Sequence, residues 1–515
     1  MGALTILMLM PTSYIRHMNM KKLFISGLFV SFALFLGRIS GFLRELFIAS
    51  SFGVSKTSDL IIVLLSIPDV LVNLLVGGAL GMILIPEQKK YTQELAKIFY
   101  LQVLYLGIVI FFIVALFLSL FSSELMHLFA PGLGPDDISS YQIYLKISLV
   151  SIPLTVAAGV TTARLNSQEK FFLPALGTLI FNIALIITIW LASKESEEVS
   201  LLYYLSFGII ISAMIRWCGL IANDNFFLFD RNILSHWLIS ISLIKKYIYC
   251  VLGSGFLFII PVIVRAISSR QGEGMLSISN YAVKLVDFPL AVCLTVFSII
   301  FLPKLSSLHV DKNNEKFATI YWTAIHVVIF LSLLISVAVI VFSYQFTSVV
   351  YNWGGMSQTE LKQVSNLLSI AIASLVFQGL NYFIISAHAA KNDTVTPLII
   401  TTSIVTIFSI VCFNTHLTVE SLLYLMCISY AAITVCLFFS ITLKHHVFLS
   451  YGTFHSLCKM SVIVVLYSLI MSFFYDSMVS TATAICITLV LMLSSILSWF
   501  FIDDEIKFLG RYSNE

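Results

Sequence analysis

Residues 24–50 read FISGLFVSFALFLGRISGFLRELFIAS, an apolar run that is long enough to cross a membrane as a helix. Two arginines, Arg38 and Arg44, interrupt this run. A charged side chain at mid-membrane depth is unfavourable by several kcal/mol unless it faces a partner or a water-filled cavity. The guanidinium group is a planar fork of donors that fits phosphate and carboxylate. We therefore expect these arginines to meet an anionic group inside the membrane.

Apolar segments of this kind recur along all 515 residues, of which 59% are hydrophobic and 11% charged. A soluble globular domain has about 25% charged residues. The short alternating strands of a membrane barrel do not occur. The predicted fold class is therefore an all-α polytopic membrane protein. We predict fourteen membrane-spanning helices, at residues 22–49, 58–85, 98–121, 138–162, 171–193, 200–222, 238–263, 276–302, 318–344, 363–387, 395–414, 419–443, 456–475 and 481–502.

The distribution of Lys and Arg predicts the orientation of these helices. If the N-terminus is cytoplasmic, 20 of the 29 basic residues lie at cytoplasmic ends and loops, and five lie on the opposite face. Basic residues concentrate in the cytoplasmic loops of membrane proteins, so both termini are expected in the cytoplasm. The net charge of +3 follows from the same rule, and no nucleic-acid partner is expected.

Prolines and glycines reveal an internal repeat with a nearly constant offset. Pro174 opens the fifth predicted span, and Pro397 opens the eleventh. Three further pairs have almost the same spacing: Pro68 with Pro289, Pro86 with Pro303, and Pro131-Gly132 with Gly354-Gly355. Six helices separate equivalent points, so both copies have the same orientation, as in secondary transporters with a substrate site between two lobes. We predict a cytoplasmic N-terminal segment, two parallel-repeat six-helix lobes, a C-terminal helix pair and a cytoplasmic tail, at residues 1–21, 22–222, 238–443, 456–502 and 503–515.

The two arginines lie six positions apart, about 240° around an ideal helix, so they share a face only where the helix bends. Three small residues in the range 37–41 favour such a bend, or the close approach of another helix. The alternative to anion binding is that each arginine pairs with a local acid, for instance Glu45, or extends to the membrane interface.

Three further charged residues within predicted spans are candidates for the site. Asp59 is in the first turn of the second span, where the helix dipole favours an acid. It either caps that helix or pairs with an arginine in a cavity. Lys284 and Asp287 are three positions apart in the eighth span and can pair on one face. The other interpretation is that Lys284 faces the same cavity as Arg38, from the second lobe.

No motif in the sequence indicates catalysis or a cofactor. A phosphate-cradling GxxxxGK[ST] loop does not occur, and no soluble domain stands between the spans. We therefore expect no enzyme activity and no cofactor, with a coupling ion or the membrane potential left open as the energy source. The ten histidines and eight cysteines show no metal-ligand spacing, and His445-His446 is expected to be solvated. Transport is the function that remains.

The stretch GRISGFLRE at residues 37–45 resembles the opening signature of the MurJ/MviN family of lipid II flippases. The eighth span, with YAVKLVDFP at residues 281–289, is similar to a second motif of that family. The resemblance covers nearly the whole chain, including the extra C-terminal helix pair. Shorter matches are TSD at 57–59, IPD at 67–69, APG at 130–132, RLN at 164–166 and FLPA at 172–175.

The resemblance implies a member of the multidrug/oligosaccharidyl-lipid/polysaccharide exporter superfamily in the bacterial cytoplasmic (inner) membrane. Such proteins move undecaprenyl-pyrophosphate-linked disaccharide-pentapeptide, lipid II, to the outer leaflet for peptidoglycan synthesis. It also implies that Arg38, Arg44 and Asp59 line a central cavity. Lys284 stands where the family usually has an arginine. Two positions depart from the pattern, because Asn73 replaces an arginine and Gly77 a glutamate.

The predicted function is lipid II flipping by alternating access. Arg38, Arg44 and Lys284 are expected to hold the pyrophosphate, and Asp59, Asn73 and Asp287 complete the set of candidate substrate-binding residues. The expected partners are the lipid-linked precursor, membrane lipids and cell-wall synthesis enzymes. The alternatives are an exporter of another undecaprenyl-linked glycan or of drugs, and a non-transporting membrane scaffold for cell-wall enzymes.

Overall fold

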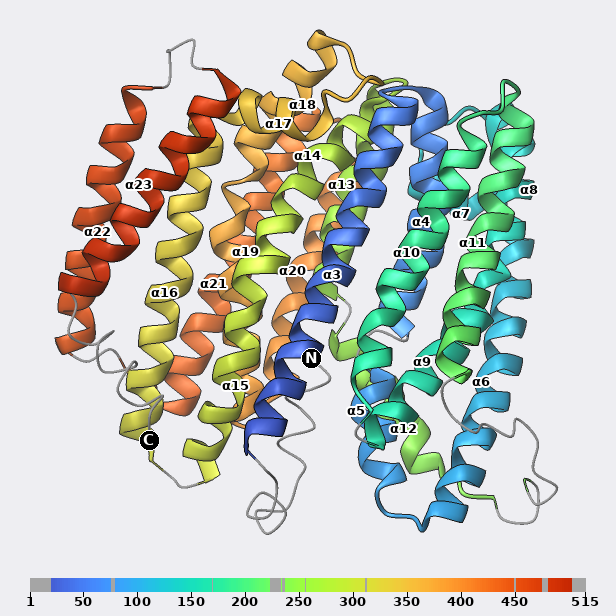
Figure 1. Ribbon diagram of the computed structural model, residues 1–515, viewed down its shortest axis with the longest axis horizontal. Coiled ribbons are helices and arrows are strands. Elements are labelled where there is room, and N and C mark those ends of the chain that lie inside the picture. The colour runs from blue at the N-terminus through green and yellow to red at the C-terminus, as the bar shows by residue number, and fades with distance from the viewer. Residues whose placement is uncertain are drawn as a thin grey trace. The chain divides into compact units, whose positions relative to one another are not determined.

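In the ranges that it describes, the computed structural model contains helices and no strands, as predicted for an all-α protein (Figure 1). The predicted cytoplasmic tail, most of the N-terminal segment and Gly77 lie outside these ranges. Asn73 lies on a described helix, but its side chain is outside the described part. The described ranges are 20–75, 79–168, 170–222, 233, 237–254, 256–310, 313–448, 451–474 and 480–502.

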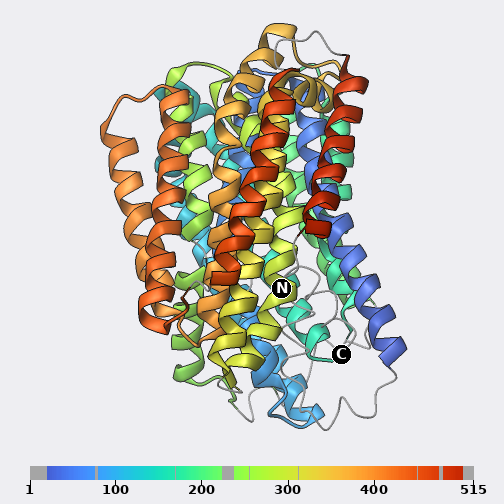
Figure 2. The same cartoon turned by 90° about the vertical axis from the view of Figure 1, so that its left-hand side faces the viewer.

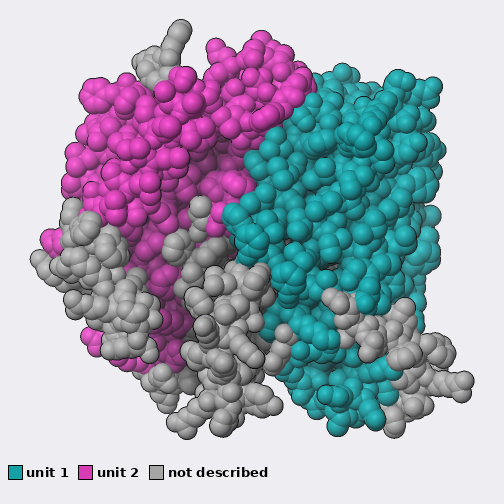
Figure 3. Space-filling model, viewed as in Figure 1, with its two compact units in different colours: residues 1–277 teal, residues 278–515 magenta. Residues whose placement is uncertain are grey.

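The chain forms two compact units, Met1–Ser277 and Ile278–Glu515 (Figure 3). The boundary falls inside helix α14 (Met275–Pro289). The seventh predicted span therefore packs within the first unit, although the repeat assigns it to the second lobe. The helix contacts show which segments pack together, but they do not show which copy of the repeat a segment belongs to. The lobe boundaries at 222 and 238 therefore stay a prediction.

The helices follow the repeat that the sequence predicts. In the first unit the order is α6 (Gln93–Leu120), α7 (Ser122–Phe129), α8 (Pro135–Leu149), α9 (Ser151–Ser167), α10 (Phe172–Ala192) and α11 (Glu198–Ile221). In the second unit it is α16 (Asn314–Val341), α17 (Ser343–Tyr351), α18 (Gln358–Ala371), α19 (Ser374–Ala390), α20 (Val395–Asn414) and α21 (Val419–His445). Each helix of the second set follows its counterpart at a nearly constant offset along the chain. The two short helices, α7 and α17, recur with the long ones.

The fourth and tenth predicted spans each consist of two helices with a break between them. Helices α18 and α19 meet at an angle of 47°. At the start of α19, the Ser374 hydroxyl donates a hydrogen bond to the Ala371 carbonyl at 2.6 Å. Ser151, at the start of α9, donates equivalently to Ser148 at 2.7 Å. Such hydroxyl bonds compete with the helical N–H groups and favour a bend. Both copies share this feature, but of these two helix pairs in the described ranges only α18 and α19 are bent by more than 40°.

Nine helices in the described ranges are long and apolar enough to cross a membrane, and ten if the bent pair counts as one span. The other four predicted spans include residues or side chains outside the described part, so the count of fourteen stays a prediction. They correspond to α3 (Met20–Phe52); α4 (Lys56–Leu75) with α5 (Ala79–Gln88); α12 (Ile241–Ser254) with η1 (Phe256–Phe258) and α13 (Ile259–Ser268); and α14 with the π-helix η3 (Leu290–Leu294) and α15 (Thr295–Val310).

Helix α6 shows why the protein belongs in a lipid environment. Its apolar window is only 11% buried, and Leu116, Phe117 and Leu120 are 51%, 58% and 78% exposed. A contiguous apolar surface of this kind is unfavourable in water. A helix satisfies its own backbone hydrogen bonds, so the same surface is stable against lipid tails.

The C-terminal pair, α22 (Tyr451–Ser472) and α23 (Thr481–Ile502), packs within the second unit (Figure 2). Phe330 of α16 stacks against Trp499 of α23 with 4.3 Å between ring centroids. Tyr467 and Met471 of α22 are buried in the same apolar cluster. The pair lies outside the repeat, yet it shares a core with α16.

The turn after α7 is a site where a single added methyl group should destabilise the first unit. The Gly132 amide donates to the Ser269 hydroxyl at 2.9 Å, and a Cβ at Gly132 would lie 1.9 Å from the Ser269 carbonyl oxygen. We expect Gly132→Ala to lower the free energy of unfolding by about 1–3 kcal/mol, because the backbone must shift. A thermal melt of the purified protein measures this, with Gly134→Ala as the control. The nearest atom at Gly134 is 3.9 Å away, and equal melting of both variants would contradict the predicted clash.

Candidate functional site

The small residues of the first motif bring helix α10 against helix α3 (Figure 1). A Cβ at Gly37 would lie 3.3 Å from Thr178, and one at Gly41 would lie 3.4 Å from the Asn182 amide. Asn182 Nδ2 donates to the Ser40 hydroxyl at 3.1 Å and to the Gly37 carbonyl at 3.4 Å. The predicted close approach is confirmed, and α3 runs through the motif as one unbroken helix.

Arg44 is the centre of a buried charge cluster in the first unit. Its Nη2 lies 2.8 Å from Glu45 Oε1 and 3.4 Å from Asp69 Oδ2 on α4. Arg44 and Glu45 are 9% and 6% exposed, whereas the Asp69 side chain is 42% exposed. The predicted pairing with Glu45 is confirmed, and Asp69 is a partner that the sequence reasoning missed. The shorter bond is buried and fixed, and the longer one lies at the accessible side.

Two arginine N–H donors in this region have no hydrogen-bond acceptor among the described residues. Arg44 Nε is buried and has no hydrogen-bond partner among the described residues. The same is true of Arg216 Nε on α11, which packs against Gly177 of α10. Asp69 lies near enough to attract Arg216 electrostatically as well. A buried donor without a partner is unfavourable by about 1–3 kcal/mol. An anion that accepts a hydrogen bond from such a donor would remove this penalty.

Arg216 lies near the C-terminal end of α11. The structure puts it near the charged cluster of α3 and α4. Arg38 lies six residues before Arg44 on the unbroken α3 and is partly buried. The two arginines therefore point to different sides of the helix, as the spacing predicts. Asn73 lies on α4, with its side chain outside the described part.

Asp59 neither caps its own helix α4 nor pairs with an arginine in the described part of the chain, the two alternatives that the sequence suggested. Ser55 and Ser58 cap the start of α4 reciprocally, with hydrogen bonds of 3.0 and 3.1 Å. The Asp59 carboxylate instead accepts the backbone N–H groups of Gly274 and Ser277, both at 2.7 Å. These are the unpaired amides at the beginning of α14, so Asp59 caps a helix that is distant in sequence. Within the described part of the chain, Asp59 forms no ion pair with an arginine.

Lys284 and Asp287 belong to the second unit and pair on one face of α14, as predicted. Lys284 Nζ lies 3.7 Å from Asp287 Oδ2, and their side chains are 28% and 37% exposed. The π-helix η3 begins directly after Pro289. Irregular turns of this kind are frequent at functional sites, and proline removes a backbone donor. The Lys284–Asp287 pair is partly exposed and lies close to the irregular π-helical turn of its span.

Together these features define a class of protein, a polytopic helical membrane transporter with charged residues held inside its spans. A model of the lipid II flippase MurJ family matches residues 48–496. The chain therefore belongs to the lipid II flippase MurJ family. It is 26% identical over 411 residues to the probable lipid II flippase MurJ of Rickettsia prowazekii, and the match covers 77% of each chain.

Solved structures agree on the fold. The chain is similar to a structure of lipid II flippase MurJ in an inward closed conformation, with a TM-score of 0.75 and 20% identity. That match covers 92% of this chain and 98% of the other. An inward-facing multidrug resistance MATE family transporter of the MOP superfamily matches with a TM-score of 0.64 and 12% identity, over 79% and 94%. These matches confirm the predicted all-helical membrane fold.

Proposed function

We propose that the chain moves lipid II from the cytoplasmic to the outer leaflet of the bacterial inner membrane by alternating access. The observation that carries this proposal is Arg44, a buried arginine with one fixed acid, one accessible acid and an unused donor. Family membership supplies the substrate class, a lipid with a pyrophosphate head group. The basic residues at loop ends support an orientation with both termini in the cytoplasm.

The pyrophosphate would bind Arg44 in place of Asp69. The bond from Arg44 to Asp69 is the longer of its two ion pairs, and Asp69 is the more exposed acid. Phosphate accepts bidentate hydrogen bonds from a guanidinium group. Glu45, at 2.8 Å, would hold the arginine in place while the exchange occurs. Before substrate binds, Glu45 and Asp69 would neutralise Arg44. The pyrophosphate would then replace Asp69, which is the more weakly held acid.

Other cations are further candidates for binding the anionic head group. Arg38 lies on the same helix as Arg44, and Lys284 supplies a point charge from the second unit. Arg216, with its unused buried Nε, is a further candidate that the sequence reasoning did not include. Asn73 and Gly77 replace two charged residues of the family pattern, so more of the binding would rest on Arg38 and Arg44.

The lipid tail would stay in the membrane beside the C-terminal pair. Helices α22 and α23 pack on α16 through a buried apolar cluster and present exposed apolar side chains such as Val465 and Leu493. No cofactor is required in this scheme, and a coupling ion or the membrane potential would supply the energy. Cell-wall synthesis enzymes would take up lipid II on the outer side.

The experiment that tests this function is translocation of fluorescent lipid II in vesicles that contain the purified protein. We expect translocation that unlabelled lipid II inhibits by competition, and rescue of growth in cells depleted of their own flippase. Another undecaprenyl-linked glycan should compete less well, and lipophilic drugs should not compete. If the drugs or the other glycan compete as well as lipid II does, the proposed substrate is wrong.

A further inference from the structure

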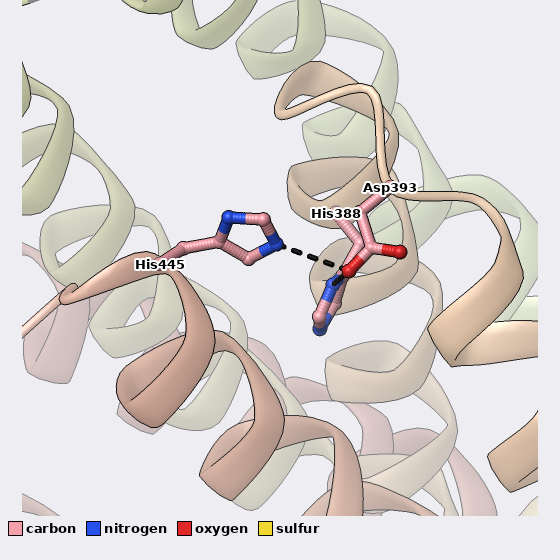
Figure 4. Close-up of side chains that lie close together, drawn as sticks. All are labelled: His388, Asp393 and His445. Carbon is pink, nitrogen blue, oxygen red and sulfur yellow. Dashed lines mark hydrogen bonds and ion pairs between the residues drawn. The ribbon is translucent and has the colours of Figure 1, made fainter.

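Three potential metal ligands meet in the second unit, on elements other than the helices that carry the charged residues assigned to the substrate (Figure 4). His388 lies in the last turn of α19, Asp393 in the turn before α20, and His445 at the end of α21. Their side chains are 0%, 8% and 16% exposed. The prediction that His445 is solvated is therefore wrong, although its neighbour His446 is exposed.

The two distances from the carboxylate to the imidazole nitrogens are close to the edges of a small coordination shell. Asp393 Oδ2 lies 3.3 Å from His388 Nδ1 and 3.0 Å from His445 Nε2. All three ligand atoms lie within 4.8 Å of one another. In a tetrahedral zinc site with bonds of about 2.0–2.1 Å, neighbouring ligand atoms are about 3.3 Å apart. Figure 4 shows both imidazole rings directed at the same carboxylate oxygen.

The surroundings hold two of the ligands in the orientation that a metal needs. The other ring nitrogen of His388, Nε2, faces the Leu437 carbonyl oxygen at 3.4 Å. The second oxygen of Asp393, Oδ1, accepts from the Thr396 amide at 3.2 Å and from its hydroxyl at 2.9 Å. Metal-binding histidines usually donate their other N–H to a carbonyl or carboxylate, and bound carboxylates are themselves hydrogen-bonded. This outer arrangement is present here.

Both ring nitrogens of His388 lie near oxygen atoms, and Lys444 supplies a positive charge beside Asp393. A neutral imidazole has one donor and one acceptor. Both nitrogens of His388 face oxygen acceptors, the Leu437 carbonyl and the Asp393 carboxylate. If Nε2 donates to Leu437, the lone pair of Nδ1 points at a carboxylate oxygen. A second ring proton or a metal ion relieves this repulsion, and a metal ion could also accept the lone pair of His445.

We propose that His388, Asp393 and His445 form a binding site for a divalent transition metal ion of the zinc class. Two imidazole nitrogens and one carboxylate oxygen leave a fourth position for water, and this donor set suits zinc better than magnesium or calcium. The site would join the ends of α19 and α21 to the turn that starts α20. It would therefore stiffen one end of the second unit. This inference does not depend on the substrate.

Lys444 is the internal competitor of the proposed metal. Its Nζ lies 2.9 Å from Asp393 Oδ2 and 2.7 Å from the Thr396 hydroxyl. A metal on Oδ2 has to displace the ammonium group, and the side chain is free to move because it is 54% exposed. Removing this charge should therefore strengthen metal binding, whereas a purely structural ion pair predicts no such gain.

The test uses the full chain, purified in detergent with an affinity tag that contains no histidine and stripped with a chelator. Titration with Zn²⁺ should give one tight equivalent per chain, and Co²⁺ should give the visible absorption of a four-coordinate site. His388→Asn and His445→Asn should each lose this equivalent. Lys444→Ala should bind roughly tenfold more tightly, because a competing positive charge is gone. Zn²⁺ should also raise the unfolding temperature of the wild type.

His446→Asn is the matched control, since His446 is exposed and asparagine tolerates its positive φ of 53°. This variant should bind like the wild type. The proposal is overturned if the wild type binds no metal, or if His388→Asn and His446→Asn bind equally. It also fails if pH alone, and not Zn²⁺, changes the unfolding temperature. If His388→Asn does not fold, the less buried His445→Asn decides the outcome.

Discussion

Arg44→Ala should reduce lipid II translocation at least tenfold, the largest functional effect expected from any single substitution in this chain. The residue supplies the fork of donors that would hold the pyrophosphate, and its loss removes charged hydrogen bonds in a buried place. Truncating one partner of a buried charged pair typically weakens binding by about 2–5 kcal/mol. Arg44→Lys should be intermediate, because lysine keeps the charge but not the bidentate geometry.

The design must separate substrate binding from stability. Arg44→Ala leaves Glu45 buried without its partner, which is itself destabilising. The double variant Arg44→Ala/Glu45→Ala removes that stranded charge and should fold, yet it should still fail to translocate lipid II. Lys362→Ala, at an exposed lysine on α18, should flip normally and serves as the control. Normal flipping by the well-expressed double variant would remove Arg44 from the site.

Two further variants test the roles of the other charged residues around Arg44. Arg38→Ala should also impair translocation, since Arg38 is the other cation of α3. Asp69→Asn should bind a pyrophosphate lipid more tightly, because the substrate no longer displaces a carboxylate from Arg44. If Asp69→Asn instead weakens binding, Asp69 positions Arg44 and does not compete with the substrate.

Asp59→Ala should give the largest loss of stability. The variant removes two 2.7 Å hydrogen bonds from a carboxylate to the amides of Gly274 and Ser277. Hydrogen bonds to a charged group contribute about 1.5–3 kcal/mol each, and the two buried amides would be left without acceptors. We expect the free energy of unfolding to fall by about 3 kcal/mol or more. A thermal melt in detergent should show this, with Asp59→Asn losing less because its amide oxygen still accepts one bond.

Asp136→Ala is a suitable control for this experiment, because Asp136 is an exposed acid in the first turn of α8. It should melt close to the wild type. A residue that acted only on substrate would leave the melting temperature unchanged and reduce translocation alone. That result for Asp59→Ala would contradict the capping role and restore Asp59 as a cavity residue.

Much of the fold could be predicted because it depends on hydropathy and on the repeat. The recurrence of Pro174 at Pro397 predicted a second copy, and the helix starts Phe172 and Val395 show the same offset. The breaks within the fourth and tenth spans could not be predicted as readily, since each depends on local hydroxyl bonds such as that of Ser374. Hydropathy averages over such details.

The site was predictable only in part, because its partners come from other helices. Glu45 is adjacent to Arg44 in sequence and could be named, whereas Asp69 meets Arg44 only through the packing of α4 against α3. The partners of Asp59 belong to a helix in a remote part of the sequence. Helical periodicity tells which residues share a face, but it does not tell which two faces meet.

The balance of charge around Arg44 has a consequence for the transport cycle. The three cations predicted to bind substrate, Arg38, Arg44 and Lys284, are matched by the acids Glu45, Asp69 and Asp287. These six groups have zero net charge, and Arg216 near the cluster of the first unit would add one positive charge. The loaded carrier holds the added negative charge of the pyrophosphate, and an inside-negative potential drives that charge outward by about 2.3 kcal/mol per charge per 100 mV. We propose that the membrane voltage favours outward movement of the loaded carrier.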